Sequence, residues 1–200
     1  MEPSDGRLSR GARSRKAITR RAVDIASLDG LDGISFGRLA DELGISKAGI
    51  QTLFRTKERL QLATVDEALA VFLAAVIVPA SSVPEGAQRI RALVEHWLEY
   101  AAAPLLPGGC FWAANLPDFD SRPGPVRDAL ADQRRAWLAV LERELTVAVE
   151  QGEIAPLDTE LGAFQIYAVL NAANIALRLG DTESVSMVHR LVDTLLTPPR

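Results

Sequence analysis

Apolar residues recur along the chain at intervals of three and four positions, the spacing of amphipathic helices, and no useful stretch alternates as a strand would. Near the start of the chain, this pattern predicts a helix that ends near Asp29 and two short helices over residues 36–43 and 47–53. Ser35 and Ser46 stand at the N-cap positions of the two short helices.

Longer apolar stripes follow in the rest of the chain, and proline and glycine separate them. They predict a series of further helices, of which the last two are long and apolar. The expected helices cover residues 57–78, 84–103, a short part of 110–124, 125–151, 158–179 and 182–196. The predicted fold class is therefore all-α.

The pattern divides the chain into three parts. Residues 1–12 are polar and rich in glycine, serine and arginine, so we expect a disordered basic arm there. Residues 13–58 are expected to form an N-terminal three-helix head, and residues 59–200 an α-helical body.

The head carries the pattern of a helix-turn-helix between residues 36 and 55. Two short helices can cross steeply only where the inner corner is small and the turn residue accepts a positive φ. Ala40 supplies the small corner and Gly44 the turn. A shared apolar seam is expected at Leu39, Leu43, Ile45, Ile50 and Leu53. Together these positions predict a helix-turn-helix that binds double-stranded DNA.

Polar and small residues are expected on the outer face of the motif. A lysine, small residues and a glutamine near the start of the second helix suit the major groove, where base edges are read. Glutamine can pair with adenine through two hydrogen bonds. The candidate DNA contacts are Arg38, Lys47, Ala48, Gly49, Gln51 and Thr52. For Lys47 a contact with DNA is favoured over a solvated charge, whereas Gly49 is equally compatible with close approach to DNA and with the relief of a packing clash.

The distribution of charge agrees with this prediction. The chain has a net charge of −4, but twelve basic and eight acidic residues in positions 1–62 give the head about +4. The rest of the chain therefore carries about −8. A basic head on an acidic body is typical of a nucleic-acid-binding protein with a second function elsewhere.

Residues 13–62 resemble the DNA-binding head of the TetR family of bacterial repressors. The resemblance rests on the run Gly44-Ile45-Ser46-Lys47 and on the spacing Phe54-x-x-Lys57-x-x-Leu60. It implies that Lys57 contacts a phosphate at the start of the fourth helix. The family usually has tyrosine where this chain has Gln51, and often another aromatic residue at Thr52, so the contact of that tyrosine does not carry over.

The body resembles the same family in its architecture. The resemblance implies a homodimer through the last two helices, with a small-molecule effector enclosed by the helices before them. It implies that residues 59–200 serve ligand binding and dimerisation, and that the protein is a repressor that this effector releases from a palindromic operator. A ligand-independent dimeric DNA-binding protein and an activator of the same fold are the alternatives.

Aromatic residues collect in the body and are candidates for lining a ligand cavity. The candidate ligand-binding residues are Trp97, Tyr100, Phe111, Trp112, Trp137, Tyr167 and Asn171. Such a cavity would take a mainly apolar ligand with little charge. Each aromatic residue could instead be part of the core, and Asn171 and Asn174 could form hydrogen bonds across a dimer seam.

The sequence offers little support for catalysis. His96 and His189 lie far apart, neither has a metal-binding partner at helical spacing, and no glycine-rich phosphate loop is present. We expect neither an enzyme nor a cofactor or metal.

A cytoplasmic protein is expected. The single cysteine, Cys110, excludes an internal disulfide framework and fits a reducing compartment. No secretory signal is recognised. The longest apolar stretch, residues 69–80, is shorter than a bilayer requires, so no membrane partner is expected.

Overall fold

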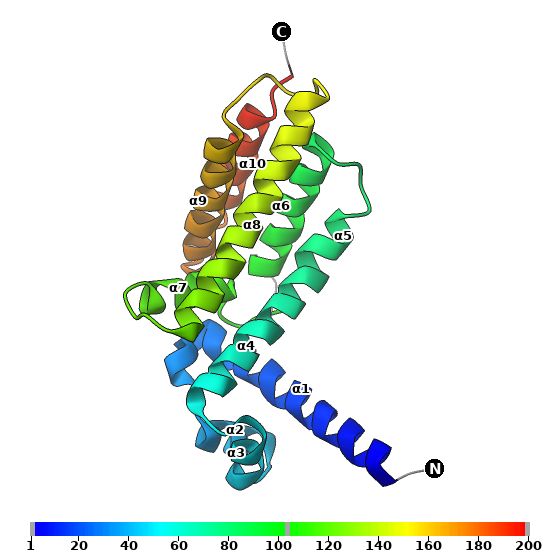
Figure 1. Cartoon of the computed structure of the whole chain (residues 1–200). Coiled ribbons are helices and arrows are strands. Elements are labelled where there is room, and N and C mark those ends of the chain that lie inside the picture. The colour runs from blue at the N-terminus through cyan, green and yellow to red at the C-terminus, as the bar shows by residue number, and fades with distance from the viewer. Residues whose placement is uncertain (1–2, 103–104, 199–200) are drawn as a thin grey trace.

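The computed structural model describes residues 3–102 and 105–198, and these residues form helices and no strand (Figure 1). The all-α prediction is confirmed. The helix-turn-helix lies at one end of the molecule, and the longest helices of the body run side by side away from it (Figure 1).

The head consists of α1, a short 3-10 helix η1, α2 and α3. Their bounds are Pro3–Asp29, Leu31–Gly33, Phe36–Leu43 and Lys47–Phe54. The helix α1 begins at Pro3 and so includes the described part of the arm expected over residues 1–12; disorder of this arm in the free protein stays a prediction. Residues 1 and 2 of that arm lie outside the described residues. The same helix continues to Asp29 and packs against α4, which links head and body.

The body consists of α4 (Lys57–Phe72), which continues through the π-helical segment η2 (Leu73–Ile77) into α5 (Val78–Ala80), and of five further helices. The further helices are α6 (Ala87–Ala102), α7 (Phe111–Phe119), α8 (Pro125–Glu150), α9 (Thr159–Arg178) and α10 (Ser184–Leu195). The central helix is α8, which packs against α4, α6, α7 and α9. The last helix, α10, packs on α9.

One continuous helical stretch, Lys57–Ala80, is long and apolar enough to cross a membrane by length and composition alone, contrary to our expectation from the sequence. Its most apolar window has a mean hydropathy of 2.0 and is 33% buried inside the molecule. It packs against α1, α6 and α8. A single helix of this kind is weak evidence for a membrane protein, because core helices of soluble proteins have the same composition.

The head joins the body through α7 and a buried asparagine. Asn115 is fully buried, and its Oδ1 accepts a hydrogen bond of 2.6 Å from the backbone N–H of Leu31. Its Nδ2 donates to the carbonyl oxygens of Ala26 at 3.1 Å and Phe111 at 2.7 Å. This single amide therefore satisfies backbone groups of α1, η1 and α7 in a place that water does not reach.

A close backbone approach completes this junction. The N–H of Gly108 donates to Ser27 Oγ at 3.0 Å, and a Cβ on Gly108 would overlap the carbonyl group of Ser27. Only glycine lets the loop before α7 lie this close to the end of α1.

The substitution Gly108→Ala is expected to lower the free energy of unfolding by at least about 2 kcal/mol, because backbone atoms of α1 would have to move. Gly11→Ala is the matched control, since a Cβ on Gly11 meets nothing within 4 Å. In the middle of a helix that change should be neutral or stabilising by up to about 1 kcal/mol. Urea unfolding followed by circular dichroism measures both variants. Equal unfolding curves for the two would contradict the close approach.

Candidate DNA-binding and ligand-binding sites

The helix-turn-helix has the caps and the turn that its residues predict. Ser35 Oγ accepts from the N–H of Arg38 at 3.1 Å, and Ser46 Oγ accepts from the N–H of Gly49 at 3.1 Å. Gly44 ends α2 in the left-handed conformation, with φ 64° and ψ 33°. Both predicted N-caps and the predicted turn are confirmed.

The apolar seam between α2 and α3 is smaller than expected. Leu39 and Ile50 are fully buried and Leu43 is partly buried. Ile45 and Leu53 are 42% and 36% exposed, so the prediction that they belong to the seam is wrong. A helix of eight residues buries only one narrow face, and Leu53 lies outside that face of α3, whereas Ile45 lies in the turn between the two helices.

The outer face of α3 is fully available to a partner. Lys47, Ala48, Gly49, Gln51 and Thr52 are all exposed. The Thr52 hydroxyl donates to the carbonyl oxygen of Ala48 at 2.8 Å. Within the described chain, the side chains of Lys47 and Gln51 make no hydrogen bond or ion pair. These two side chains are therefore the polar groups of this face that are free to bind.

Gly49 has a local structural role. A Cβ on Gly49 would lie 3.0 Å from Ser46 Oγ, the atom that caps the same helix. The missing side chain thus leaves room for the N-cap, which favours the packing interpretation of this glycine.

Two of the predicted DNA contacts are engaged inside the head. Arg38 Nη1 donates to Asp29 Oδ2 at 2.6 Å and its Nε donates to Glu42 Oε1 at 2.9 Å. The hydrogen bond from Arg38 holds the pKa of Glu42 below its usual value. Lys57 Nζ donates to the carbonyl oxygen of Asp32 at 2.8 Å. Arg38 thus fixes α2 to the end of α1, and Lys57 fixes α4 to η1; a contact of either with DNA stays a prediction.

Asp32 connects the head to the loop that follows α7. Its Oδ2 accepts from Arg122 Nη1 at 2.5 Å, and this hydrogen bond lowers the pKa of Asp32. Gln61 of α4 donates to the neighbouring carbonyl oxygen of Leu31 at 3.1 Å. Side chains from α4 and from the loop before α8 therefore meet on η1.

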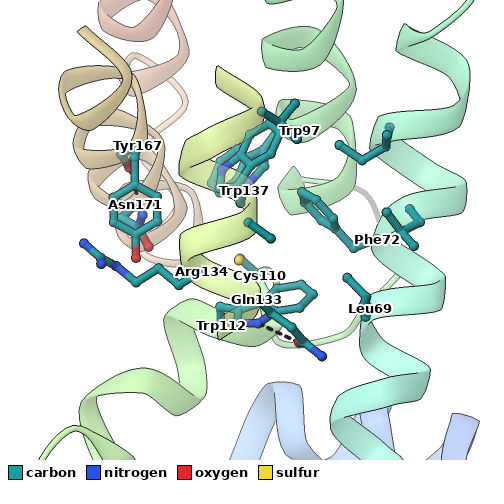
Figure 2. A pocket seen from close by; sticks show the side chains of 14 residues that line it. Leu69, Phe72, Trp97, Cys110, Trp112, Gln133, Arg134, Trp137, Tyr167 and Asn171 are labelled. Carbon is teal, nitrogen blue, oxygen red and sulfur yellow. Dashed lines mark hydrogen bonds between the residues drawn. The ribbon is translucent and has the colours of Figure 1, made fainter. Parts of the chain in front are cut away.

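The body contains a cavity between α4, α6, α7, α8 and α9 (Figure 2). Its volume is about 110 Å³, within an empty space of about 660 Å³ that includes open solvent. The lining residues are Leu69, Phe72, Leu73, Ile77, Trp97, Cys110, Trp112, Gln133, Arg134, Ala136, Trp137, Val140, Tyr167 and Asn171. Five of the seven residues suggested from the sequence lie on this wall, namely Trp97, Trp112, Trp137, Tyr167 and Asn171.

Tyr100 and Phe111 do not lie on the cavity wall, and a ligand contact of either stays a prediction. Both are buried, and the Tyr100 hydroxyl accepts from the backbone N–H of Phe111 at 3.1 Å. They belong to the core behind the cavity. Asn174 is also buried, and its Oδ1 accepts from the N–H of Cys110 at 2.8 Å.

The wall from α4 was missed in the sequence analysis. Leu69, Phe72, Leu73 and Ile77 follow one another at intervals of one, three or four residues, which places them along one side of that helix. The ring of Phe72 makes edge contacts with Trp112 and Trp137, with ring centroids 5.2 and 5.3 Å apart. The helical spacing was a usable signal, but leucine and isoleucine at that spacing are also what any core helix contains.

The polar side chains of the lining already have partners. Trp112 Nε1 donates to Gln133 Oε1 at 3.2 Å, and Asn171 Nδ2 donates to the carbonyl oxygen of Tyr167 at 2.8 Å. The guanidinium of Arg134 lies 4.8 Å from the centre of the Tyr167 ring. Burial raises the pKa of the Cys110 thiol from 9.0 to about 11, so this thiol stays neutral at physiological pH.

Each histidine lies beside a glutamate, and His189 Nε2 is buried without a hydrogen bond of regular geometry. His96 Nδ1 lies 3.1 Å from Glu99 Oε2, and His189 Nε2 lies 2.8 Å from Glu95 Oε1. Among the described residues, no group of three or more His, Cys, Asp or Glu side chains could hold a metal ion.

Comparison with known families identifies the class of protein. The family described as "Tetracyclin repressor-like, C-terminal domain" matches residues 86–192. This match covers more than half of the chain, and the helix-turn-helix precedes it. The protein therefore belongs to the TetR family of transcriptional regulators.

Solved structures of this family have the same fold. A TetR transcriptional regulator from Chloroflexus aurantiacus is 22% identical, with a TM-score of 0.82 and coverage of 94% of each chain. A TetR-family regulator from Streptomyces coelicolor is also 22% identical, with a TM-score of 0.78 and coverage of 93% of this chain and 94% of the other. AibR in complex with isovaleryl coenzyme A and operator DNA is 20% identical, with a TM-score of 0.72 and coverage of 92% and 99%. No curated protein matches the chain.

The raised pKa of Cys110, about 11, predicts slow reaction with thiol reagents at pH 8. A rise from the usual 9.0 lowers the thiolate fraction by about 100-fold at this pH, and burial blocks access as well. The rate of labelling should therefore be at least about 100-fold lower in the folded chain than in denaturant. Cys110 is the single cysteine of the sequence, so a colorimetric thiol assay reads it alone. Labelling at equal rates in both states would contradict the burial of this thiol.

Proposed function

We propose that the protein is a homodimeric repressor that binds a palindromic operator through α3 and is released by a small molecule in the body cavity. The observation that carries this proposal is that one chain combines an exposed, polar recognition helix with an aromatic cavity, and that α7 borders this cavity and packs against α1 of the head. The similar protein AibR has been solved with both operator DNA and a small molecule, which supports the same combination here. We expect this regulator to act in the cytoplasm and without catalysis.

The recognition step would place α3 in the major groove. The exposed residues of α3 would face the bases, with Lys47 at the start of the helix and Gln51 one turn later. Gln51 would read adenine, and Lys47 would neutralise a phosphate or contact a base edge. In a dimer, two such helices would enter successive grooves about 34–36 Å apart.

The dimer step rests on an apolar stripe along α9. Leu161, Phe164, Ile175 and Leu179 are between 52% and 81% exposed, at helical spacing on the side away from the core. Met187 on α10 is 53% exposed. Exposed apolar patches of this kind mark interaction surfaces. Since α9 and α10 pack together, a second copy would cover the stripe and form a four-helix interface with two-fold symmetry.

The release step would pass through α7. Trp112 lines the cavity, and Asn115, three residues further along the same helix, holds the ends of α1 and η1. A ligand that displaces the Trp112 ring would shift α7, and Asn115 would carry the shift to the head. Arg122 would add a second link through Asp32. The ligand would thus favour a spacing of the two heads that fits the operator less well.

The substitution Gln51→Ala is expected to weaken binding to the promoter DNA of the protein's own gene by about 10-fold, since one bidentate base contact is lost. Binding to unrelated DNA should not change. Lys47→Ala should weaken binding to both DNAs. It should also reduce the slope of log affinity against log salt concentration by about one, because one phosphate contact is lost. Mobility shifts at several salt concentrations measure these effects.

The matched control for DNA binding is Gln151→Ala, because Gln151 is an exposed glutamine directly after the C-terminal end of α8. Unchanged promoter preference in Gln51→Ala, or no sequence preference in the wild type, would overturn the assignment of α3 as the reading helix.

The substitution Ile175→Glu is expected to turn the dimer into a folded monomer, because it buries a charge in the proposed interface. Val78→Glu is the control, since Val78 is 63% exposed and Ile175 61%, and only Ile175 lies on the α9 stripe. Light scattering after size exclusion measures the mass of each variant. A monomeric wild type, or a dimeric Ile175→Glu variant, would contradict the proposed dimer.

A further inference from the structure

The size of the cavity limits the ligand to a small molecule. The cavity volume is about 110 Å³. An engineered apolar protein cavity of roughly 150 Å³ binds one benzene. The space therefore fits one aromatic ring with a small substituent, and two fused rings would have to move the walls or extend into the part that is open to solvent.

The walls offer aromatic rings on several sides. Phe72 lies across from Trp97 and Trp137, with Trp112 below them in the view of Figure 2. Phe72 already contacts both Trp112 and Trp137 edge to face, the arrangement that aromatic pairs favour. A further ring among them would find the same favourable contacts.

No charge of the lining is directed into this space. Among the described lining residues there is no carboxylate, and the Cys110 thiol is neutral below pH 9 because its pKa is about 11. The guanidinium of Arg134 lies on the Tyr167 ring and points away from the tryptophans (Figure 2). A charged group placed among the tryptophans would therefore lose its hydration without gaining an opposite charge there.

Gln133 supplies one hydrogen-bond donor at the edge of the aromatic cluster. Its Oε1 accepts from Trp112 Nε1, and this bond turns the amide so that Nε2 is free to donate (Figure 2). A hydroxyl or carbonyl oxygen on the ring of a ligand could accept from Nε2.

We propose that the cavity binds an uncharged molecule of a single aromatic ring that carries at most one hydroxyl or carbonyl substituent. This inference rests on the proposed function, because it names the class of effector for the same cavity. Para-cresol is a suitable probe, and benzoate is a probe of similar size that is charged at pH 7.

The chain provides its own optical reporter. It has three tryptophans, and Trp97, Trp112 and Trp137 all line the cavity. Titration of the full chain with para-cresol at pH 7 should change the tryptophan fluorescence in a saturable manner. Benzoate and 2-naphthol should each bind at least about 10-fold more weakly, the first because of its charge and the second because of its size. Equal or tighter binding of either one, or no binding of para-cresol, overturns the proposal.

Two variants locate the binding. Val140→Phe fills the cavity and should weaken para-cresol by at least about 10-fold, whereas Val78→Phe, on an exposed valine, should have no effect. If Val140→Phe does not fold, Gln133→Leu tests whether para-cresol binds in this cavity. This substitution removes the hydrogen-bond donor at nearly constant side-chain volume. It should weaken the affinity for para-cresol several-fold, whereas toluene, which has no oxygen, should bind as it does to the wild type. Para-cresol binding as tight as in the wild type in both Val140→Phe and Gln133→Leu overturns the assignment to this cavity.

A mobility shift with promoter DNA separates this inference from the proposed function. Binding of para-cresol without release of DNA would overturn the release step and support the ligand class. Release by benzoate and not by para-cresol would overturn the ligand class and support the release step.

Discussion

The buried amide of Asn115 is the interaction on which the rest of the structure depends. The end of α1 and the start of η1 leave a carbonyl and an N–H with no helical partner, and both lie where water does not reach. One side chain satisfies both groups and comes from α7, which also forms a wall of the cavity. The position of the head is therefore set by the same helix that a ligand would touch.

The head and the body solve different physical problems. In the head, cations and carboxylates are paired at the surface, as in the contacts of Arg38 with Asp29 and Glu42, which fix short helices that have little core of their own. In the body, the polar groups near the cavity are paired among themselves and leave carbon surfaces free. This division explains how a chain with a net charge of −4 can have a basic, solvent-exposed head and a mainly apolar cavity in the body.

The sequence predicted the parts of the structure that depend on local chemistry. Ser35, Ser46 and Gly44 act on backbone groups within four residues, so their roles could be read without knowing the fold. Tyr100 and Trp97 lie three residues apart on α6, yet one is core and the other lines the cavity. That difference depends on which helices cover each face, and no pattern within α6 contains this information. The pairing of Arg38 with Asp29 likewise requires the angle between α1 and α2.

The π-helical segment Leu73–Ile77 gives α4 a second property. A π turn holds one residue more than an α turn, so the residues after it are rotated by about 100° relative to a regular helix. Leu73 and Ile77 lie in the cavity wall within this irregular turn. A shift of its hydrogen bonds back to the α pattern would rotate α5 about the helix axis and leave Lys57–Phe72 intact. The long apolar stretch Lys57–Ala80 thus has its irregular turn at the cavity wall, distant from the end that joins the head.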